Sequence, residues 1–308
     1  MTPEIVATLR KTIGGKTSLL VSRAVDIAGK NGLVELVPDM LDAFARFIDN
    51  GAEVDKGCRA KTSIINALNT FEYLGGAIFA AGAYYIQMEP SFGPPEDTAV
   101  EVRSGCAHAL ARIVHPDAHF ILTDLLVDKE RTVRIAAAQA LTYLGDVESE
   151  ALLRLKILTG DKEASVVAEC FVALTTMSPA RSLDFVARYL DGGHYTGNLG
   201  EAIIEGAALA IGGSHLPEAL TKLISAYNST YSPSVRRLLL LPIALIRSDD
   251  AFEHLLTILG NADARLAIDT IAPLRLYAGD RYVDRVRDVV AQRGDSAISQ
   301  RFQEELGS

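Results

Sequence analysis

The chain of 308 residues carries 30 lysines and arginines against 39 aspartates and glutamates, which gives a net charge of −9. Hydrophobic residues make up 49% of the chain and charged residues 22%, a composition typical of a folded protein and not of a disordered one. Because affinity for nucleic acid comes mainly from lysine and arginine contacts with phosphates, the acidic balance argues against a nucleic-acid partner.

The cysteines and the apolar stretches favour a cytoplasmic protein. The chain has three cysteines, Cys58, Cys106 and Cys170. They are too few and too widely spaced for a disulfide framework or a structural zinc site. The residues after Met1 lack the charged and then apolar profile of a secretory signal. The most apolar stretch, from Leu74 to Ile86, is shorter than the roughly 20 residues of a membrane span, so we expect no membrane partner.

The N-terminal part of the chain contains two segments with helical periodicity, Thr17 to Gly29 and Leu33 to Ile48. Their closeness in sequence predicts an antiparallel helical hairpin. Just before them, Gly15 and Lys16 belong to a stretch that is similar to a phosphate-binding loop. Arg10 stands where that motif requires its first glycine, so we expect only a connecting turn there.

A longer motif begins at Asp55 and repeats along the rest of the chain. The best-matched copies are Asp97, Val102 and Arg103, and then Asp128, Val133 and Arg134, which follow 31 residues later. An alanine–leucine pair follows each copy: Ala67-Leu68, Ala109-Leu110, Ala140-Leu141 and Ala173-Leu174. Apolar residues at this spacing form one face of a helix, and aspartate is favoured where a helix begins. The motif therefore predicts repeated helical hairpins, with the aspartate at the start of each second helix.

This repeat resembles the HEAT-repeat family, including its short bacterial, phycobilin-lyase-like form, and Asp128 to Gly145 carries the resemblance most fully. The resemblance implies an all-α fold, an α-α superhelix of the HEAT or armadillo type with about seven to eight helical hairpins in a single domain, 1–308. It also implies a ladder of charges that ties adjacent repeats together. By position, its members are Lys61, Arg103, Arg134, Arg236 and Arg265, with Asp55, Asp97, Asp128 and Asp161.

The sequence shows no pattern typical of a catalytic or metal site. His115 and His119 have the spacing of two ligands on one helix face, but the proline between them places His115 at the helix start, as a cap. Cys106 and Cys170 align with Ala137 in the repeat, so we expect both in the core, where a thiol is unreactive. The chain also lacks the His-Glu dipeptides of the HEAT-repeat deoxyhypusine hydroxylases. We therefore expect no cofactor and no metal.

An irregular insertion interrupts the repeat near 84–97, where the step between successive motifs is longer than the next one. Insertions in solenoids often lie on the binding face, and tyrosine and methionine are enriched at interfaces. The candidate partner contacts are Tyr84, Tyr85, Gln87, Met88, Glu89 and Phe92. The alternative is that Tyr84 and Ile86 end a buried helix and that 90–95 forms a turn. A second irregular segment, 191–198, is rich in glycine and contains His194.

The second helices of stacked hairpins line a groove, which is the common binding surface of such folds. Ser104 and Ile135 fall outside the core pattern of these helices, and the candidate partner contacts among them are His108, Arg112, Arg131 and Gln139. The sequence therefore favours a non-enzymatic scaffold or adaptor that binds a protein or peptide. One alternative is an enzyme, lyase-like or of another kind, that binds a small molecule or chromophore in the groove. Another is a structural subunit of a larger assembly.

Overall fold

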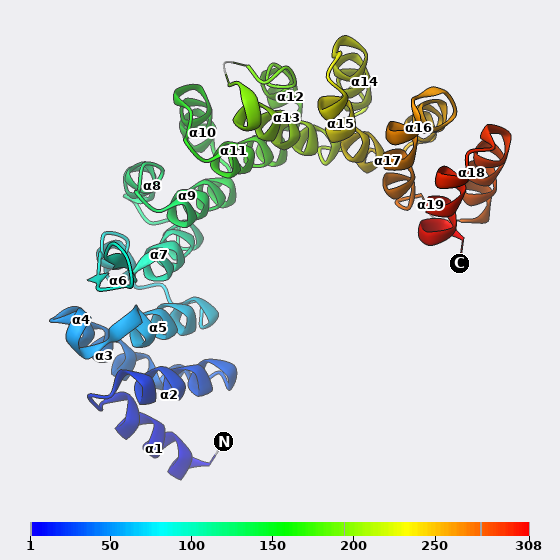
Figure 1. The fold of residues 1–308 in the computed structure, drawn as a ribbon. Coiled ribbons are helices and arrows are strands. Elements are labelled where there is room, and N and C mark those ends of the chain that lie inside the picture. The colour runs from blue at the N-terminus through cyan, green and yellow to red at the C-terminus, as the bar shows by residue number, and fades with distance from the viewer. Residues whose placement is uncertain (1, 194, 278, 308) are drawn as a thin grey trace. The chain divides into compact units, whose positions relative to one another are not determined.

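The computed structural model describes residues 2–193, 195–277 and 279–307. Within them, the chain folds into nineteen α-helices, two short 3₁₀ helices and one pair of two-residue strands (Figure 1). The prediction of an all-α repeat fold is confirmed. The helices separate into two compact units, Met1–Leu152 and Leu153–Ser308, which are described in turn. None of the described helices has the combination of length and apolar character that crossing a membrane requires.

The first unit is a stack of helical hairpins in two layers. Its elements are α1 (Pro3–Ile13), α2 (Ser18–Lys30), η1 (Val34–Leu36), α3 (Val37–Ile48), α4 (Gly51–Val54), η2 (Lys56–Cys58), α5 (Arg59–Thr70), α6 (Gly76–Gly82), β1 (Met88–Glu89), β2 (Glu96–Asp97), α7 (Val100–Arg112), α8 (Ala118–Leu125) and α9 (Arg131–Leu144). The helices α2, α5, α7 and α9 pack side by side in one layer, and α3, α6 and α8 pack against them in the other (Figure 1).

The second unit repeats this two-layer arrangement. Its elements are α11 (Ala164–Met177), α12 (Pro179–Ala187), α13 (Gly197–Gly212), α14 (Ala219–Ser229), α15 (Pro233–Leu245), α16 (Asp249–Asn261), α17 (Ala264–Leu274), α18 (Asp280–Arg293) and α19 (Ser296–Leu306), while α10 (Val147–Thr159) contains the boundary between the units. The helices α11, α13, α15, α17 and α19 pack in sequence, and α12, α14, α16 and α18 pack against them.

The repeat motif supplies the core of each hairpin. In α9, the side chains of Val133, Ala137, Ala140 and Leu141 are fully buried, as the helical spacing predicts. Their counterparts in α7 are buried to the same degree: Val102, Cys106, Ala109 and Leu110. The small residues bring neighbouring helices close together. At Gly206 of α13, an added Cβ would lie 2.6 Å from the Cβ of Ala168 in α11, so only glycine allows this approach.

The repeated aspartates lie before the second helices and not at their first position. Asp128 accepts a hydrogen bond from the amide of Glu130 at 2.7 Å, and α9 begins only at Arg131. Asp97 accepts in the same way from the amide of Ala99, at 3.0 Å. The prediction that each aspartate begins the helix is therefore wrong. Instead, the aspartate accepts a hydrogen bond within the turn that precedes the helix. Its carboxylate can still pair with an arginine.

Ion pairs of the kind that the predicted ladder requires occur at Arg103 and Lys61. Arg103 contacts Asp97 of its own repeat at 2.7 Å and Asp128 of the next repeat at 2.9 Å. In the preceding repeat, Lys61 contacts Asp55 at 2.9 Å, and both side chains are fully buried. Each pair joins a second helix to the turn before it, and Arg103 also links two hairpins.

Two other members of the ladder donate hydrogen bonds to backbone carbonyls. Arg134 donates to the backbone carbonyls of Asp128 and Lys129, at 2.8 and 3.0 Å. Arg236 donates to the carbonyl of Thr230 at 3.1 Å, while Arg265 is exposed. The ladder assignment is therefore wrong for Arg265, because its side chain is exposed to solvent at the start of α17.

Candidate partner-binding site

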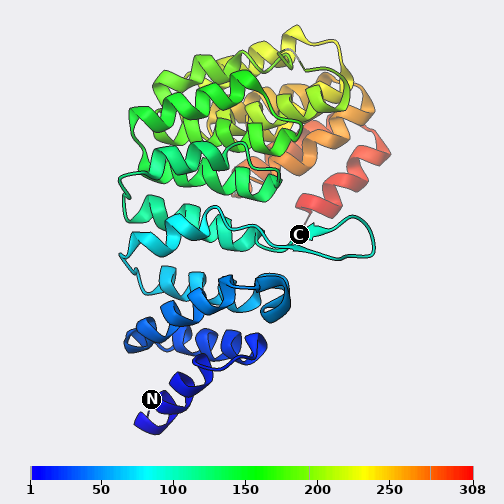
Figure 2. The same ribbon diagram turned by 90° about the vertical axis from the view of Figure 1, so that its left-hand side faces the viewer.

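The irregular segment after α6 forms a β-hairpin that leads into α7. We refer to residues 84–98 as the hairpin. Its strands β1 and β2 are antiparallel, with Met88 opposite Asp97 and Glu89 opposite Glu96. The amide of Thr98 donates to the carbonyl of Gln87 at 2.9 Å and extends the pairing by one step. Figure 2 shows the hairpin as the cyan loop that extends beyond the ends of the neighbouring helices.

The side chains of Gln87 and Glu89, in the first half of the hairpin, point toward the preceding repeat. The amide nitrogen of the Gln87 side chain donates to the carbonyl of Asp55 at 2.9 Å and to Glu89 at 2.6 Å. The Glu89 carboxylate also accepts from the amide of Gly57 at 2.7 Å and from the hydroxyl of Thr98 at 2.8 Å. Gln87 is only 3% exposed. Both side chains anchor the hairpin to the preceding repeat, and Gln87 is too deeply buried to be the exposed contact that the sequence predicts.

The charge of Glu89 is stabilised by this anchor. Burial by itself would raise the pKa of its carboxyl group. The hydrogen bonds from Gln87, Gly57 and Thr98, together with the nearby ammonium group of Lys61, outweigh burial and lower the pKa below its ordinary value. The carboxylate is therefore charged at neutral pH and holds three donors at once.

Two buried cations fix the base of the hairpin. Arg103 donates to the carbonyl of Tyr85 at 2.9 Å, and the ammonium group of Lys61 lies 5.2 Å from the centre of the Tyr85 ring. The Tyr85 hydroxyl donates to the side-chain oxygen of Gln87 at 2.7 Å. Tyr85 is half-buried, so it too serves mainly as an anchor, in contrast to the exposed contact that the sequence predicts.

The apolar side chains of the same strand point into solvent. Ile86 is 60% exposed and Met88 is 52% exposed, while Phe92 at the tip is fully exposed. Residues i and i+2 share one face of a strand, so Ile86 and Met88 lie on the face opposite to Gln87 and Glu89. The sequence prediction omits Ile86 as a contact. The alternation of apolar and polar residues from 86 to 89 is the signal that could have identified it.

Exposed apolar side chains of the next repeat adjoin the base of the hairpin. The hydroxyl of Tyr84 donates to Asp124 of α8 at 2.7 Å. Phe120 and Val127 lie on either side of Asp124 at helical spacing, and both side chains are exposed. Burial, the hydrogen bond to Asp124 and the charge of that carboxylate raise the pKa of Tyr84 to about 12. Sequence reasoning missed both residues: Phe120 lies on the face of α8 opposite to its buried leucines, and Val127 lies in the turn that follows α8.

The four candidate contacts on α7 and α9 divide into two kinds. His108 and Gln139 are exposed at equivalent positions of adjacent helices, and Arg131 is exposed at the start of α9. Arg112 is half-buried and donates to the carbonyl of Tyr73 at 2.9 Å, so it holds the turn after α5. Ser104, also expected in this groove, is buried and donates to the carbonyl of Val100. Within the described part of the chain, no hydrogen bond or ion pair joins these residues to the hairpin.

The described cysteines and histidines are not gathered at a metal site. All three cysteines are buried and free, and burial raises the pKa of the Cys170 thiol to about 12. Cys106 is buried in α7, as predicted. His119 lies 3.0 Å from Asp146, and His115 accepts a hydrogen bond from the amide of Asp117. Residues 2–193, 195–277 and 279–307 contain no group of three or more histidine, cysteine or acidic side chains placed to hold a metal.

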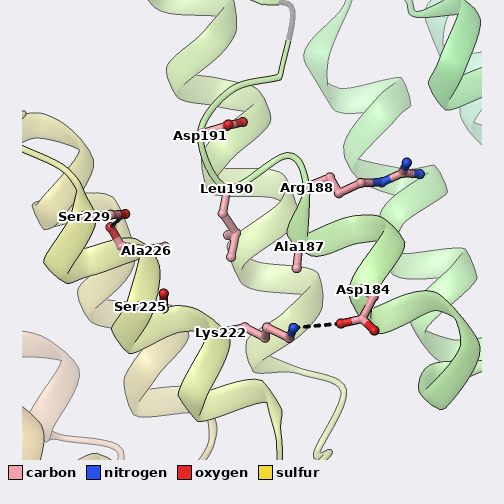
Figure 3. A pocket seen from close by; sticks show the side chains of 9 residues that line it. All are labelled: Asp184, Ala187, Arg188, Leu190, Asp191, Lys222, Ser225, Ala226 and Ser229. Carbon is pink, nitrogen blue, oxygen red and sulfur yellow. Dashed lines mark hydrogen bonds and ion pairs between the residues drawn. The ribbon is translucent and has the colours of Figure 1, made fainter.

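The second unit contains a surface pocket of about 350 Å³ between α12 and α14 (Figure 3). Its lining residues are Asp184, Ala187, Arg188, Leu190, Asp191, Lys222, Ser225, Ala226 and Ser229. Lys222 reaches across the pocket to Asp184, 2.7 Å away (Figure 3). Lys222 and Asp184 therefore neutralise each other's charge. Asp191 begins the glycine-rich segment of the sequence prediction, and His194 of that segment lies outside the described residues.

Comparison with known proteins supports the repeat assignment. Residues 96–175 match the family model for HEAT repeats, which confirms the HEAT-type repeat from β2 to α11. The complex of CpcE and CpcF of phycocyanin lyase from Nostoc sp. PCC7120 is similar in structure, with 18% identity and a TM-score of 0.38 over 80% of this chain and 92% of that one. An engineered protein is similar with 14% identity and a TM-score of 0.36, over 100% of this chain and 98% of the other. No curated protein sequence matches the chain significantly.

Proposed function

We propose that this chain is a non-enzymatic repeat scaffold that binds a partner protein through the hairpin and the adjoining face of α8. The observation that carries the proposal is the reversed polarity of residues 86–89, where Gln87 is buried and Glu89 is half-buried while Ile86 and Met88 face solvent. An apolar side chain in water contributes nothing to folding, whereas its burial against a partner is favourable. Exposed apolar patches of this kind mark interaction sites.

The composition and anchoring of the surface support the same proposal. Ile86, Met88 and Phe92 on the hairpin, with Phe120 and Val127 beside it, offer the large side chains that are typical of interface cores. The buried contacts of Gln87 and Glu89 hold the strand in place before any partner arrives. A surface that is already ordered loses less conformational entropy on binding.

Three exposed polar residues of the second-helix layer are also part of the proposed binding surface. His108 and Gln139 stand at equivalent positions of α7 and α9, and Arg131 is exposed at the start of α9. Extended partners commonly contact several repeats of a solenoid. We assign these three residues to contacts with a partner that continues from the hairpin across the repeats.

Site-specific crosslinking tests the proposal. The photoreactive residue p-benzoylphenylalanine replaces Phe92 in one variant and Leu74 in the control, and both are irradiated in lysate of the source cell. Leu74 is also exposed and apolar, but it precedes α6 and lies outside the hairpin. We expect a discrete crosslinked product from the Phe92 position and none of the same mass from the Leu74 position. Equal products at the two positions, or none at Phe92, would contradict the proposal.

A further inference from the structure

We infer that the outer edge of β1 binds an extended segment of the partner as an added β-strand, and that this segment has alternating apolar side chains and a flanking basic residue. The inference rests on the proposed function and specifies the conformation and charge of the partner. It follows from the hydrogen-bonding register of the hairpin, the side chains along its edge and the carboxylate of Asp124 beside that edge.

The register leaves the backbone of Met88 unpaired. In antiparallel strands, residues alternate between positions whose N–H and C=O groups face the neighbouring strand and positions whose groups face away. Gln87 and Thr98 are joined by a backbone hydrogen bond, so the next pair, Met88 and Asp97, is of the second kind. The N–H and C=O groups of Met88 therefore point away from β2. Among the described residues, they have no partner, and those of Ile86 have none either.

The edge of β1 lacks the features that protect exposed edges in other proteins. Such edges usually carry lysine, proline or a bulge, or are covered by another element. From Ile86 to Glu89 the strand contains neither lysine nor proline, and its first proline, Pro90, comes where the tip of the hairpin begins. An unpaired edge with exposed apolar side chains is a template for another strand. A partner with apolar residues at every second position would place them against Ile86 and Met88.

A charge beside this edge favours a basic partner. At the Ile86 end, the exposed carboxylate of Asp124 is held close by the hydroxyl of Tyr84. A lysine or arginine residue that flanks an apolar segment would meet this carboxylate, and the net charge of −9 would favour its approach.

The peptide arm of the test uses a displayed library of random twelve-residue peptides, selected on the full-length chain. We expect the enriched peptides to share alternating apolar residues with flanking lysine or arginine. Each is then synthesised with an N-methyl group at one backbone position at a time. Added strands donate only from alternate amides, so methylation should weaken binding by about tenfold at every second position. A helical peptide would not show a period of two, and that result, or a library without binders, overturns the inference.

The protein arm compares Met88→Pro with Met88→Thr. Because the amide of Met88 does not donate to β2, proline removes only the outward donor, and edge positions whose N–H faces solvent tolerate it. We expect Met88→Pro to weaken binding of the selected peptides by about tenfold and Met88→Thr by less than about threefold, with unchanged helical circular dichroism in both. Equal binding by the two variants would exclude strand addition. If Phe92 still crosslinks to its partner in that case, the proposed function stands without the inference.

Discussion

Arg103 holds Asp128 through two parallel hydrogen bonds, from Nε to Oδ2 at 2.9 Å and from Nη2 to Oδ1 at 3.2 Å. Since Arg103 lies on α7 and Asp128 lies before α9, this pair ties one hairpin to the next. The same guanidinium group contacts Asp97 at 2.7 Å, and the side chain is almost fully buried. Only a planar guanidinium group can satisfy both carboxylates at once.

Replacement of Arg103 by alanine should lower the free energy of unfolding by about 3 to 5 kcal/mol, because it leaves two largely buried carboxylates without a counter-charge. Arg131→Ala is the matched control, since that side chain is exposed on the same stack and should cost less than about 0.5 kcal/mol. Urea unfolding followed by circular dichroism measures both. Similar midpoints for the two variants would show that the ladder does not stabilise the repeats.

The reversed polarity of β1 predicts an unusual order of stabilities. Gln87→Ala should lower the free energy of unfolding by about 1 to 3 kcal/mol, because it leaves the carbonyl of Asp55 without its buried donor. Ile86→Ala and Phe92→Ala should each change it by less than about 0.5 kcal/mol, since both side chains face solvent. Thermal and urea unfolding of the three variants provide the comparison. A large loss on truncation of Ile86 would mean that it packs in the core.

The anchor at Glu89 predicts a loosening of the hairpin in acid. Its pKa is lower in the folded protein than its ordinary value of 4.5, so its stabilising effect is complete above that value. The effect is lost as the pH falls from about 4.5 through the lower folded pKa. The chain has no tryptophan, so a Phe92→Trp variant gives a fluorescent probe at the tip alone. Its anisotropy should fall over this pH range while the helical circular dichroism is unchanged.

The matching control adds Glu89→Gln to the Phe92→Trp variant. A glutamine side chain does not titrate, so the anisotropy of the double variant should not depend on pH between 6 and the acid limit of the folded helices. If the double variant shows the same acid transition as the single one, another group causes the loosening, and the role assigned to Glu89 is incorrect.

The thiols should be unreactive in the native protein. Cys58, Cys106 and Cys170 are all buried, and burial raises the pKa of each thiol, so the reactive thiolate is scarce. Titration with Ellman's reagent should detect none of the three at neutral pH and all of them after unfolding in guanidinium. Rapid reaction of one thiol in the native state, traced by Cys→Ser variants, would contradict its burial.

The burial of Cys106 is expected from the repeat itself. Cys106 aligns with Ala137, and both lie in the closely packed layer of second helices. The alignment identifies this core position because helical periodicity is local, and a residue's place on the helix decides whether it faces the neighbouring helix. The same locality let the sequence predict the helices, their apolar faces and the arginine positions of the best-matched repeats.

Only the tertiary structure decided which side chains of the hairpin face the protein and which face solvent. The partners of its side chains lie in other repeats: Gln87 binds the carbonyl of Asp55, 32 residues earlier, and Tyr84 binds Asp124, 40 residues later. Strand pairing and contacts between repeats depend on how the hairpins stack, and no local pattern encodes that stacking. For this reason the sequence located the irregular segment but treated Gln87 and Glu89 as exposed contacts. Stacking buries Gln87 and half-buries Glu89 against the preceding repeat, and it leaves Ile86 and Met88 in solvent.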